Sequence, residues 1–125
     1  MIIQIIGLPC VGKTFLIKQY LKTKTNIEHV DIRNFSHPKR EEKLINYICK
    51  EPKKYIIESA CGIQIDSSIV IEIKKNNYYH QKNMKRRNET ISENDLFQIK
   101  NQMIPADFVL YDNSILDEML DYYFN

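Results

Sequence analysis

Residues 7–14 combine glycine, lysine and threonine at a spacing that suits phosphate chemistry. They read Gly7-Leu8-Pro9-Cys10-Val11-Gly12-Lys13-Thr14 and match the pattern G-x-x-x-x-G-K-[ST]. Glycine permits backbone conformations that other residues avoid, so several N–H groups can converge on a polyphosphate at the positive end of a helix. This pattern predicts a phosphate-binding loop (P-loop). An ordinary glycine-containing turn between a strand and a helix is the alternative.

The sequence on either side of this loop predicts the elements that must hold it. Residues 2–6 form a β-branched run with one polar interruption, which indicates a buried strand. Residues 13–22 carry apolar side chains at helical spacing. The loop is therefore expected to join a strand to a helix, which is the context that a phosphate-binding loop requires.

We predict that the loop and the first helical turn bind ATP together with Mg²⁺. Lys13 is expected to neutralise the β and γ phosphates, and the hydroxyl of Thr14 to join the Mg²⁺ shell. Cys10 stands at a variable position, where we interpret it as a filler rather than a nucleophile or redox switch. The predicted nucleotide-binding residues are Gly7, Cys10, Val11, Gly12, Lys13, Thr14 and Phe15.

Apolar runs alternate with helical patterns along the rest of the chain. Short apolar strands separated by helices are typical of βαβ units, whose parallel strands are covered on both faces. We therefore predict an α/β protein, with a three-layer P-loop NTPase fold of about five parallel strands and flanking helices, as a single domain over residues 1–125. Ser36 and Ser92 are expected to cap two of the helices. Further strands are predicted at 27–31, 55–57, 69–73 and 108–111, and further helices at 38–49, 77–87, 92–103 and 115–123.

Charge is distributed unevenly over the second half of the chain. Residues 74–87 contain six basic residues and no acidic one, whereas residues 88–125 contain eight acidic residues and one lysine. A basic segment between a strand and a helix suits a lid, over about residues 76–92, whose guanidinium groups bind a transferring phosphoryl group. We assign that catalytic role to Arg86 and Arg87. We expect His80 and the lysines to lie on a solvated helix face.

Motifs that the chain lacks narrow the class of P-loop protein. The Asp-x-x-Gly and Asn-Lys-x-Asp segments of GTPases do not occur. Motor and transporter ATPases need far longer chains than 125 residues. These absences favour a small kinase, in which ATP meets a small-molecule acceptor beneath a basic lid.

Four later segments follow one another in an order that resembles a known family of kinases. Ser68-Ile69-Val70-Ile71-Glu72-Ile73 precedes Met84-Lys85-Arg86-Arg87, then come Ile91-Ser92-Glu93-Asn94-Asp95 with Gln102, and finally residues 106–113, which begin Ala-Asp and end in Asn. Together with the P-loop, this order resembles dephospho-CoA kinase and the related phage deoxynucleoside monophosphate kinases. The resemblance implies a P-loop kinase fold and phosphoryl transfer from ATP.

The resemblance also implies roles for residues at the ends of strands. Asp31 occupies the place of the family's strand-closing aspartate, so it would accept the hydroxyl proton or orient the acceptor and Mg²⁺. Asn113 falls where these kinases contact adenine, although a turn-forming asparagine is nearly as good an account. Apart from the resemblance, Glu58 ends a predicted strand at the edge where α/β sheets bind ligands, and could hold Mg²⁺. A carboxylate that pairs with a cation at the strand end is an equal alternative.

The segment between Asp31 and the third strand is short, with room for one helix over about residues 33–53. The resembling enzymes carry a larger acceptor-binding insertion there, so a nucleotide or nucleotide-like acceptor is expected rather than dephospho-CoA itself. His37-Pro38-Lys39-Arg40 is faintly similar to gluconate kinase, which keeps a sugar acid open. Arg33 and Arg40 could bind an acidic acceptor or serve the surface. A regulatory nucleotide-binding module without efficient catalysis is the second hypothesis.

Composition sets the outer limits of function. A net charge of +2 and a hydrophobic content of 43% argue against a histone-like protein, so nucleic acid is not an expected partner. The chain has no long apolar run and no signal-peptide pattern, so neither a membrane span nor secretion is expected. Cys10, Cys49 and Cys61 form no CxxC pair, which favours a reducing, cytoplasmic compartment. The sequence does not predict an oligomeric state.

Overall fold

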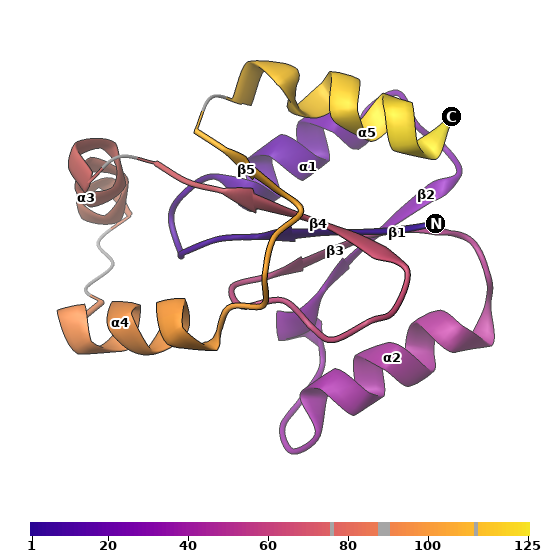
Figure 1. Cartoon of the computed structure of the whole chain (residues 1–125), viewed down its shortest axis with the longest axis horizontal. Helices are drawn as coiled ribbons and strands as arrows, with labels where there is room; N and C mark the ends of the chain where they lie inside the picture. The colour runs from indigo at the N-terminus through magenta and orange to yellow at the C-terminus, as the bar shows by residue number, and fades with distance from the viewer. Residues whose placement is uncertain (76, 88–90, 112) are drawn as a thin grey trace.

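A computed structural model describes residues 1–75, 77–87, 91–111 and 113–125. Its strands form one sheet in the order β2-β3-β1-β4-β5, with every neighbouring pair parallel (Figure 1). The strands are β1 (Ile2–Ile6), β2 (Ile27–Asp31), β3 (Lys54–Ser59), β4 (Ser68–Ile73) and β5 (Phe108–Leu110). The helices are α1 (Lys13–Leu21), α2 (Arg40–Lys50), α3 (Asn77–Arg86), α4 (Glu93–Gln102) and α5 (Leu116–Phe124), with 3₁₀ turns η1 (Ile32–Asn34) and η2 (Asn113–Ile115).

Helices cover both faces of the sheet, which confirms the predicted three-layer α/β architecture (Figure 1). On one face, α1 and α5 pack against the sheet through a cluster that includes Ile5, Ile17 and Leu120. On the other face, Leu44 and Ile48 of α2 join a second cluster. β1 is buried on both faces because it lies in the middle of the sheet, as its β-branched sequence predicts.

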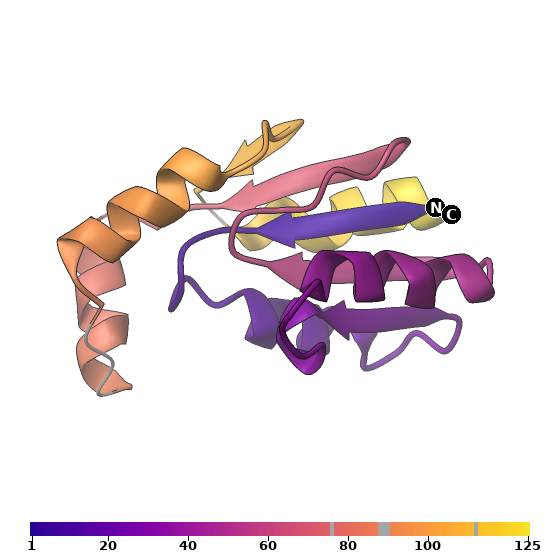
Figure 2. The ribbon, with the colours of Figure 1, turned by 90° about the horizontal axis from the view of Figure 1, so that it is seen from below.

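The order of the strands brings the chemistry-bearing loops to one edge. β1 lies between β3 and β4, and β2 lies beside β3, so the carboxyl ends of β1, β2 and β3 are neighbours. Ligands of open α/β sheets bind outside such carboxyl ends. Helices α3 and α4 lie beyond this same edge of the sheet (Figure 2).

The polar interruption in β1 is explained by Gln4, which is fully buried. Its Nε2 donates to the carbonyl of Ile63 at 2.8 Å, and its Oε1 accepts from the N–H of Ile63 at 2.9 Å. The side chain therefore satisfies a loop residue in the way that a neighbouring strand would. This contact ties the segment after β3 to the central strand.

Two local predictions fail, while the Ser92 cap is confirmed. Ser92 accepts a hydrogen bond from Asp95 N at 3.1 Å at the start of α4. Ser36 does not cap α2, because the helix begins only at Arg40 and a serine four residues earlier is out of reach of its first turn. His80 is not on a solvated face: its exposed fraction is 6%, because it packs against the phosphate loop. Within the described ranges, no helix has the length and apolar character needed to cross a membrane.

Candidate functional site

The loop from Gly7 to Thr14 leaves β1 and enters α1, as predicted. A Cβ on Gly7 would lie 2.5 Å from the carbonyl oxygen of Ile73, so this position requires a residue without a side chain. Gly12 caps α1 with a left-handed φ of 95°. Cys10 also has a positive φ, of 68°, which is uncommon for a residue with a side chain. The loop thus has the irregular backbone that lets successive N–H groups face one ligand.

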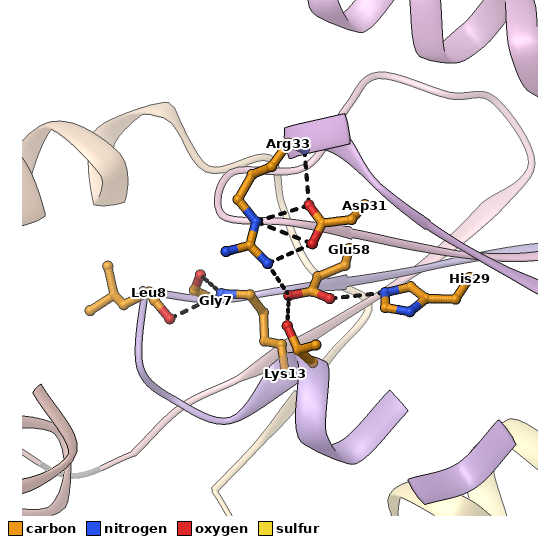
Figure 3. A network of polar contacts seen from close by, with 8 residues as sticks. Gly7, Leu8, Lys13, His29, Asp31, Arg33 and Glu58 are labelled. Carbon is orange, nitrogen blue, oxygen red and sulfur yellow. Dashed lines mark hydrogen bonds and ion pairs between the residues drawn. The ribbon is translucent and has the colours of Figure 1, made fainter. Parts of the chain in front are cut away.

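Lys13 points back across its own loop (Figure 3). Its Nζ donates to the carbonyl oxygens of Gly7 at 2.6 Å and Leu8 at 3.0 Å. Only 9% of the residue is exposed. Burial lowers the pKa of Lys13 from 10.5 to about 8, although the nearby Glu58 carboxylate opposes this shift. The ammonium group is held at the loop by carbonyls that a phosphate could replace.

Glu58 lies at the centre of the polar network beside the loop. Its Oε2 accepts a hydrogen bond from Thr14 Oγ1 at 2.5 Å, and its Oε1 contacts His29 Nε2 at 2.9 Å. Burial pushes the pKa of Glu58 upward, but the hydrogen bonds from His29 and Thr14 outweigh burial, and the net pKa is lowered. Glu58 is therefore an ionised carboxylate at neutral pH, directly against the threonine of the loop.

Asp31 lies opposite Glu58 in the register of β2 and β3. Arg33 binds it through the Nε–Nη2 edge of its guanidinium: Nη2 is 2.6 Å from Oδ2, and Nε is 3.1 Å from each carboxylate oxygen. Burial raises the pKa of Asp31, but the side-chain and backbone hydrogen bonds from Arg33 lower it by more. The same Nη2 is 3.8 Å from Glu58 Oε2, so one guanidinium spans both carboxylates (Figure 3).

The residues around Glu58 fit a divalent cation. The hydroxyl of Thr14 and the carboxylates of Asp31 and Glu58 are hard oxygen ligands of the kind that Mg²⁺ prefers. His29 adds a nitrogen, and the potential ligand atoms of His29, Asp31 and Glu58 lie within 4.8 Å of one another. Sequence reasoning missed His29. It lies two residues before Asp31 on β2, and the two-residue period of a strand places both side chains on the same face.

A cavity of about 260 Å³ joins the loop to these carboxylates. It brings together several predicted site residues with Arg33 and Arg40, the two arginines that the sequence offered as acceptor-binding candidates, which come from η1 and the start of α2. Arg87, just beyond α3, also lines it. Within the described part of the chain, four predicted site residues do not line this cavity: Gly7, Val11, Phe15 and Arg86. The side chain of the fifth, Asn113, lies outside what the structure describes. The predicted residues that line the cavity are Cys10, Gly12, Lys13, Thr14, Asp31, Glu58 and Arg87.

Similarity to known proteins was found in sequence and in structure, although no model of a protein family matches the chain. A protein of Pyrococcus abyssi named "Putative adenylate kinase" is 27% identical over 110 residues, which cover 88% of this chain. The chain spans only 47% of the length of that protein.

Solved structures with the same fold include two kinases. A sugar kinase from Janibacter superposes with a TM-score of 0.70 at 11% identity, covering 98% of this chain and 92% of that chain. Shikimate kinase from Aquifex aeolicus has a TM-score of 0.63 at 12% identity, covering 98% and 95% of the two chains. An uncharacterised protein from Eubacterium ventriosum has a TM-score of 0.66 at 13% identity, covering 99% and 98%.

These likenesses establish the fold, a five-stranded parallel sheet with flanking helices of the P-loop kinase type. They do not single out dephospho-CoA kinase, whose resemblance rests on the segments named above.

Proposed function

We propose that the protein is an ATP-dependent kinase that transfers the γ-phosphoryl group to a hydroxyl or phosphate of a small metabolite. A nucleotide or nucleotide-like molecule is the first acceptor class to test, and a sugar acid is the second. The observation that carries this proposal is that Lys13 and Thr14 of the loop line the same cavity as Asp31 and Arg87. Kinases need this combination, because phosphoryl transfer depends mainly on positioning and charge neutralisation.

The donor side of the reaction falls to the loop. Its N–H groups would bind the phosphates, and the Lys13 ammonium would leave the carbonyls of Gly7 and Leu8 for the phosphate oxygens. Thr14, Glu58 and Asp31 would hold Mg²⁺, which supplies charge neutralisation between the phosphates when it is bound. Arg87 reaches the same cavity and would stabilise negative charge on the transferred group.

The acceptor side falls to Asp31 and the arginines around it. Asp31 is ionised at neutral pH because Arg33 lowers its pKa, so it can accept a hydrogen bond from an acceptor hydroxyl. Arg33 and Arg40 give this side two further cations. An acceptor with an anionic group would exchange the Arg33–Asp31 contact for one with its own oxygens, which leaves Asp31 available to the hydroxyl.

The second candidate function is nucleotide binding without efficient catalysis, as in a regulatory module. The specific observation in its favour is the bidentate pairing of Asp31 with Arg33, which ties up the candidate base. Tight Mg²⁺-dependent nucleotide binding without turnover on any acceptor would select this alternative.

The proposal is tested by ADP release in the presence of ATP, Mg²⁺ and a panel of acceptors. The panel contains deoxynucleotides, nucleosides, dephospho-CoA and sugar acids, with a Lys13→Ala variant as the inactive control. We expect one class to stimulate ADP release well above the control. If no acceptor does so, the kinase assignment fails. Asp31→Asn then tests the base, since a variant with full turnover on the true acceptor would exclude that role.

A further inference from the structure

Two polar side chains of helix α3 contact backbone carbonyl oxygens of the phosphate loop. His80 Nε2 lies 2.7 Å from the carbonyl oxygen of Pro9. Asn83 Nδ2 donates to the carbonyl oxygen of Cys10 at 3.1 Å. Residues three apart lie on the same face of a helix, so one face of α3 meets two successive carbonyls of the loop. His80 is 6% exposed on a helix whose neighbouring positions are mostly exposed.

In both contacts the side chain from α3 is the hydrogen-bond donor and the loop carbonyl is the acceptor. A carbonyl oxygen can only accept, so the Nε2 atom of His80 carries the proton in this contact. Asn83 donates through its amide nitrogen in the same sense. α3 therefore offers two donors to two neighbouring peptide groups, and both peptides are held by their oxygen atoms.

Because the peptide bond is planar, holding its carbonyl oxygen also fixes the direction of its N–H group. In a trans peptide the C=O and the N–H point in opposite directions. The carbonyl of Pro9 shares its peptide with the N–H of Cys10, and the carbonyl of Cys10 shares its peptide with the N–H of Val11. Holding the two oxygens toward α3 turns these two N–H groups away from the helix. The left-handed φ of 68° at Cys10 is the kind of conformation that makes such N–H groups converge.

We propose that His80 and Asn83 are positioning residues of the phosphate loop, which preset the N–H groups of Cys10 and Val11 for the phosphates of a nucleotide. This inference rests on the proposed function, since it takes the ligand to be a nucleoside di- or triphosphate. It assigns a binding role to two residues outside the G-x-x-x-x-G-K-[ST] pattern, which lie 66 and 69 positions after its last residue, Thr14. An N–H that already points at the ligand site costs no reorientation on binding, which raises affinity.

The same contact also fixes the helix that carries an arginine to the cavity. The N–H of Arg87 donates to the carbonyl of Asn83 at 3.2 Å, at the end of α3. Asn83 therefore touches the loop with its side chain and the Arg87 segment with its backbone. The position of Arg87 and the orientation of the loop are set at one place on α3.

Mg²⁺–ADP binding to matched variants of α3, measured by titration calorimetry, tests this proposal. His80→Phe keeps a ring but removes the donor, whereas His80→Gln keeps an N–H near the position of Nε2. We expect His80→Phe to raise the dissociation constant roughly fivefold to tenfold, and His80→Gln to stay within about twofold of the unmodified protein. Asn83→Leu, at a partly exposed position, should weaken binding in the same direction. Gln81→Ala, exposed on the same helix, is the control and should leave binding unchanged.

A second measurement separates failure of this inference from failure of the proposed function. The amide ¹⁵N signals of Cys10 and Val11 in nucleotide-free protein respond to the hydrogen bonds at the carbonyl oxygens of the same two peptides. We expect both signals to shift in His80→Phe and to stay in place in His80→Gln. If the unmodified protein binds no nucleotide, the proposed function fails, and the amide signals still decide the positioning role. Equal nucleotide affinity, or unchanged amide signals, in a folded His80→Phe or Asn83→Leu variant would overturn it.

Discussion

The phosphate loop takes its shape from consecutive residues, whereas the opposite side of the cavity is assembled from five separate segments. In the loop, backbone geometry dominates: Gly7 approaches Ile73 closely, and Gly12 has a positive φ. On the other side, side-chain charges dominate. They come from the end of β2, η1, the start of α2, the end of β3 and the residue that follows α3. Arg33 among them is 69% exposed at its side chain.

This contrast separates two kinds of constraint. The loop can accept few substitutions at Gly7 and Gly12, because the course of the main chain there excludes or disfavours a side chain. The proposed acceptor side would change its preference when an arginine is replaced, because its charges are carried by side chains rather than by the backbone. A kinase with these two halves would keep its nucleotide while its acceptor changes.

The strongest test of the loop is removal of its cation. We expect Lys13→Met to lower kcat/KM for ATP roughly 10³-fold, since a charge aimed at the phosphates is lost from a buried site. Lys18→Met is the matched control, because Lys18 is an exposed lysine on the same helix, and it should keep nearly full activity. Thermal unfolding should show that Lys13→Met is folded, since methionine suits a buried site. Comparable losses in both variants would remove the special role of Lys13.

The side of the cavity opposite the loop is tested by two neighbouring arginines, Arg86 at the end of α3 and Arg87 just beyond it. The sequence predicts a catalytic role for both, but only Arg87 lines the described cavity. We expect Arg87→Gln to lower kcat about 10²-fold, and Arg86→Gln to change it by less than about threefold. Steady-state kinetics with the true acceptor measures both variants. Equal effects of the two substitutions would mean that lining the cavity does not give Arg87 a role that Arg86 lacks.

The sequence predicts the features that depend on consecutive residues better than those that depend on contacts between separate segments. The strands, the helices and the loop were predicted to within a few residues, because the P-loop and the apolar runs are local patterns. Asp107 shows that part of the family resemblance reflects the fold. Its carboxylate accepts a hydrogen bond from Val70 N at 2.8 Å, so the aspartate of the Ala-Asp segment helps to hold β4 beside the segment that leads into β5.

What the sequence could not predict depends on contacts between distant residues. His29 reaches Glu58 across neighbouring strands, and His80 reaches Pro9 over 71 positions. A histidine in a polar helix gives no local sign of burial, so His80 was assigned to the surface. The pairing of Arg33 with Asp31 spans only two residues, yet its geometry depends on the η1 turn that follows β2.

The two glycines of the loop separate steric from conformational constraint. Gly7→Ala places a methyl group against the backbone of β4, which cannot retreat without disturbing the sheet. We expect a loss of about 3 kcal/mol in the free energy of unfolding. Gly12→Ala meets no atom within 4 Å but keeps a left-handed φ of 95°, so we expect a loss of about 1 kcal/mol. Denaturant unfolding measures both, and a reversed order would contradict the close approach at Gly7.

The lowered pKa of Lys13 makes nucleotide binding by the loop dependent on pH. In the nucleotide-free protein this pKa is about 8, so the ammonium is half populated near pH 8. Phosphates favour the charged form, so binding should take up about half a proton at that pH. Above pH 8, affinity for Mg²⁺–ADP should fall by up to about tenfold per pH unit. The unbound protein should show the opposite trend: between pH 8 and 10.5 the unfolded chain keeps the proton that the folded protein has lost, so this residue adds stability as pH rises.

Calorimetry in two buffers with different heats of ionisation measures the proton uptake on binding. Lys13→Arg is the matched control, because a guanidinium stays protonated throughout this range and its affinity should not depend on pH between 7.5 and 9.5. An affinity of the unmodified protein that stays constant over the same range would mean that Lys13 is fully charged before the nucleotide arrives. The loop would then hold its cation against burial by the carbonyls of Gly7 and Leu8 alone, and those two contacts, rather than the phosphates, would determine its charge.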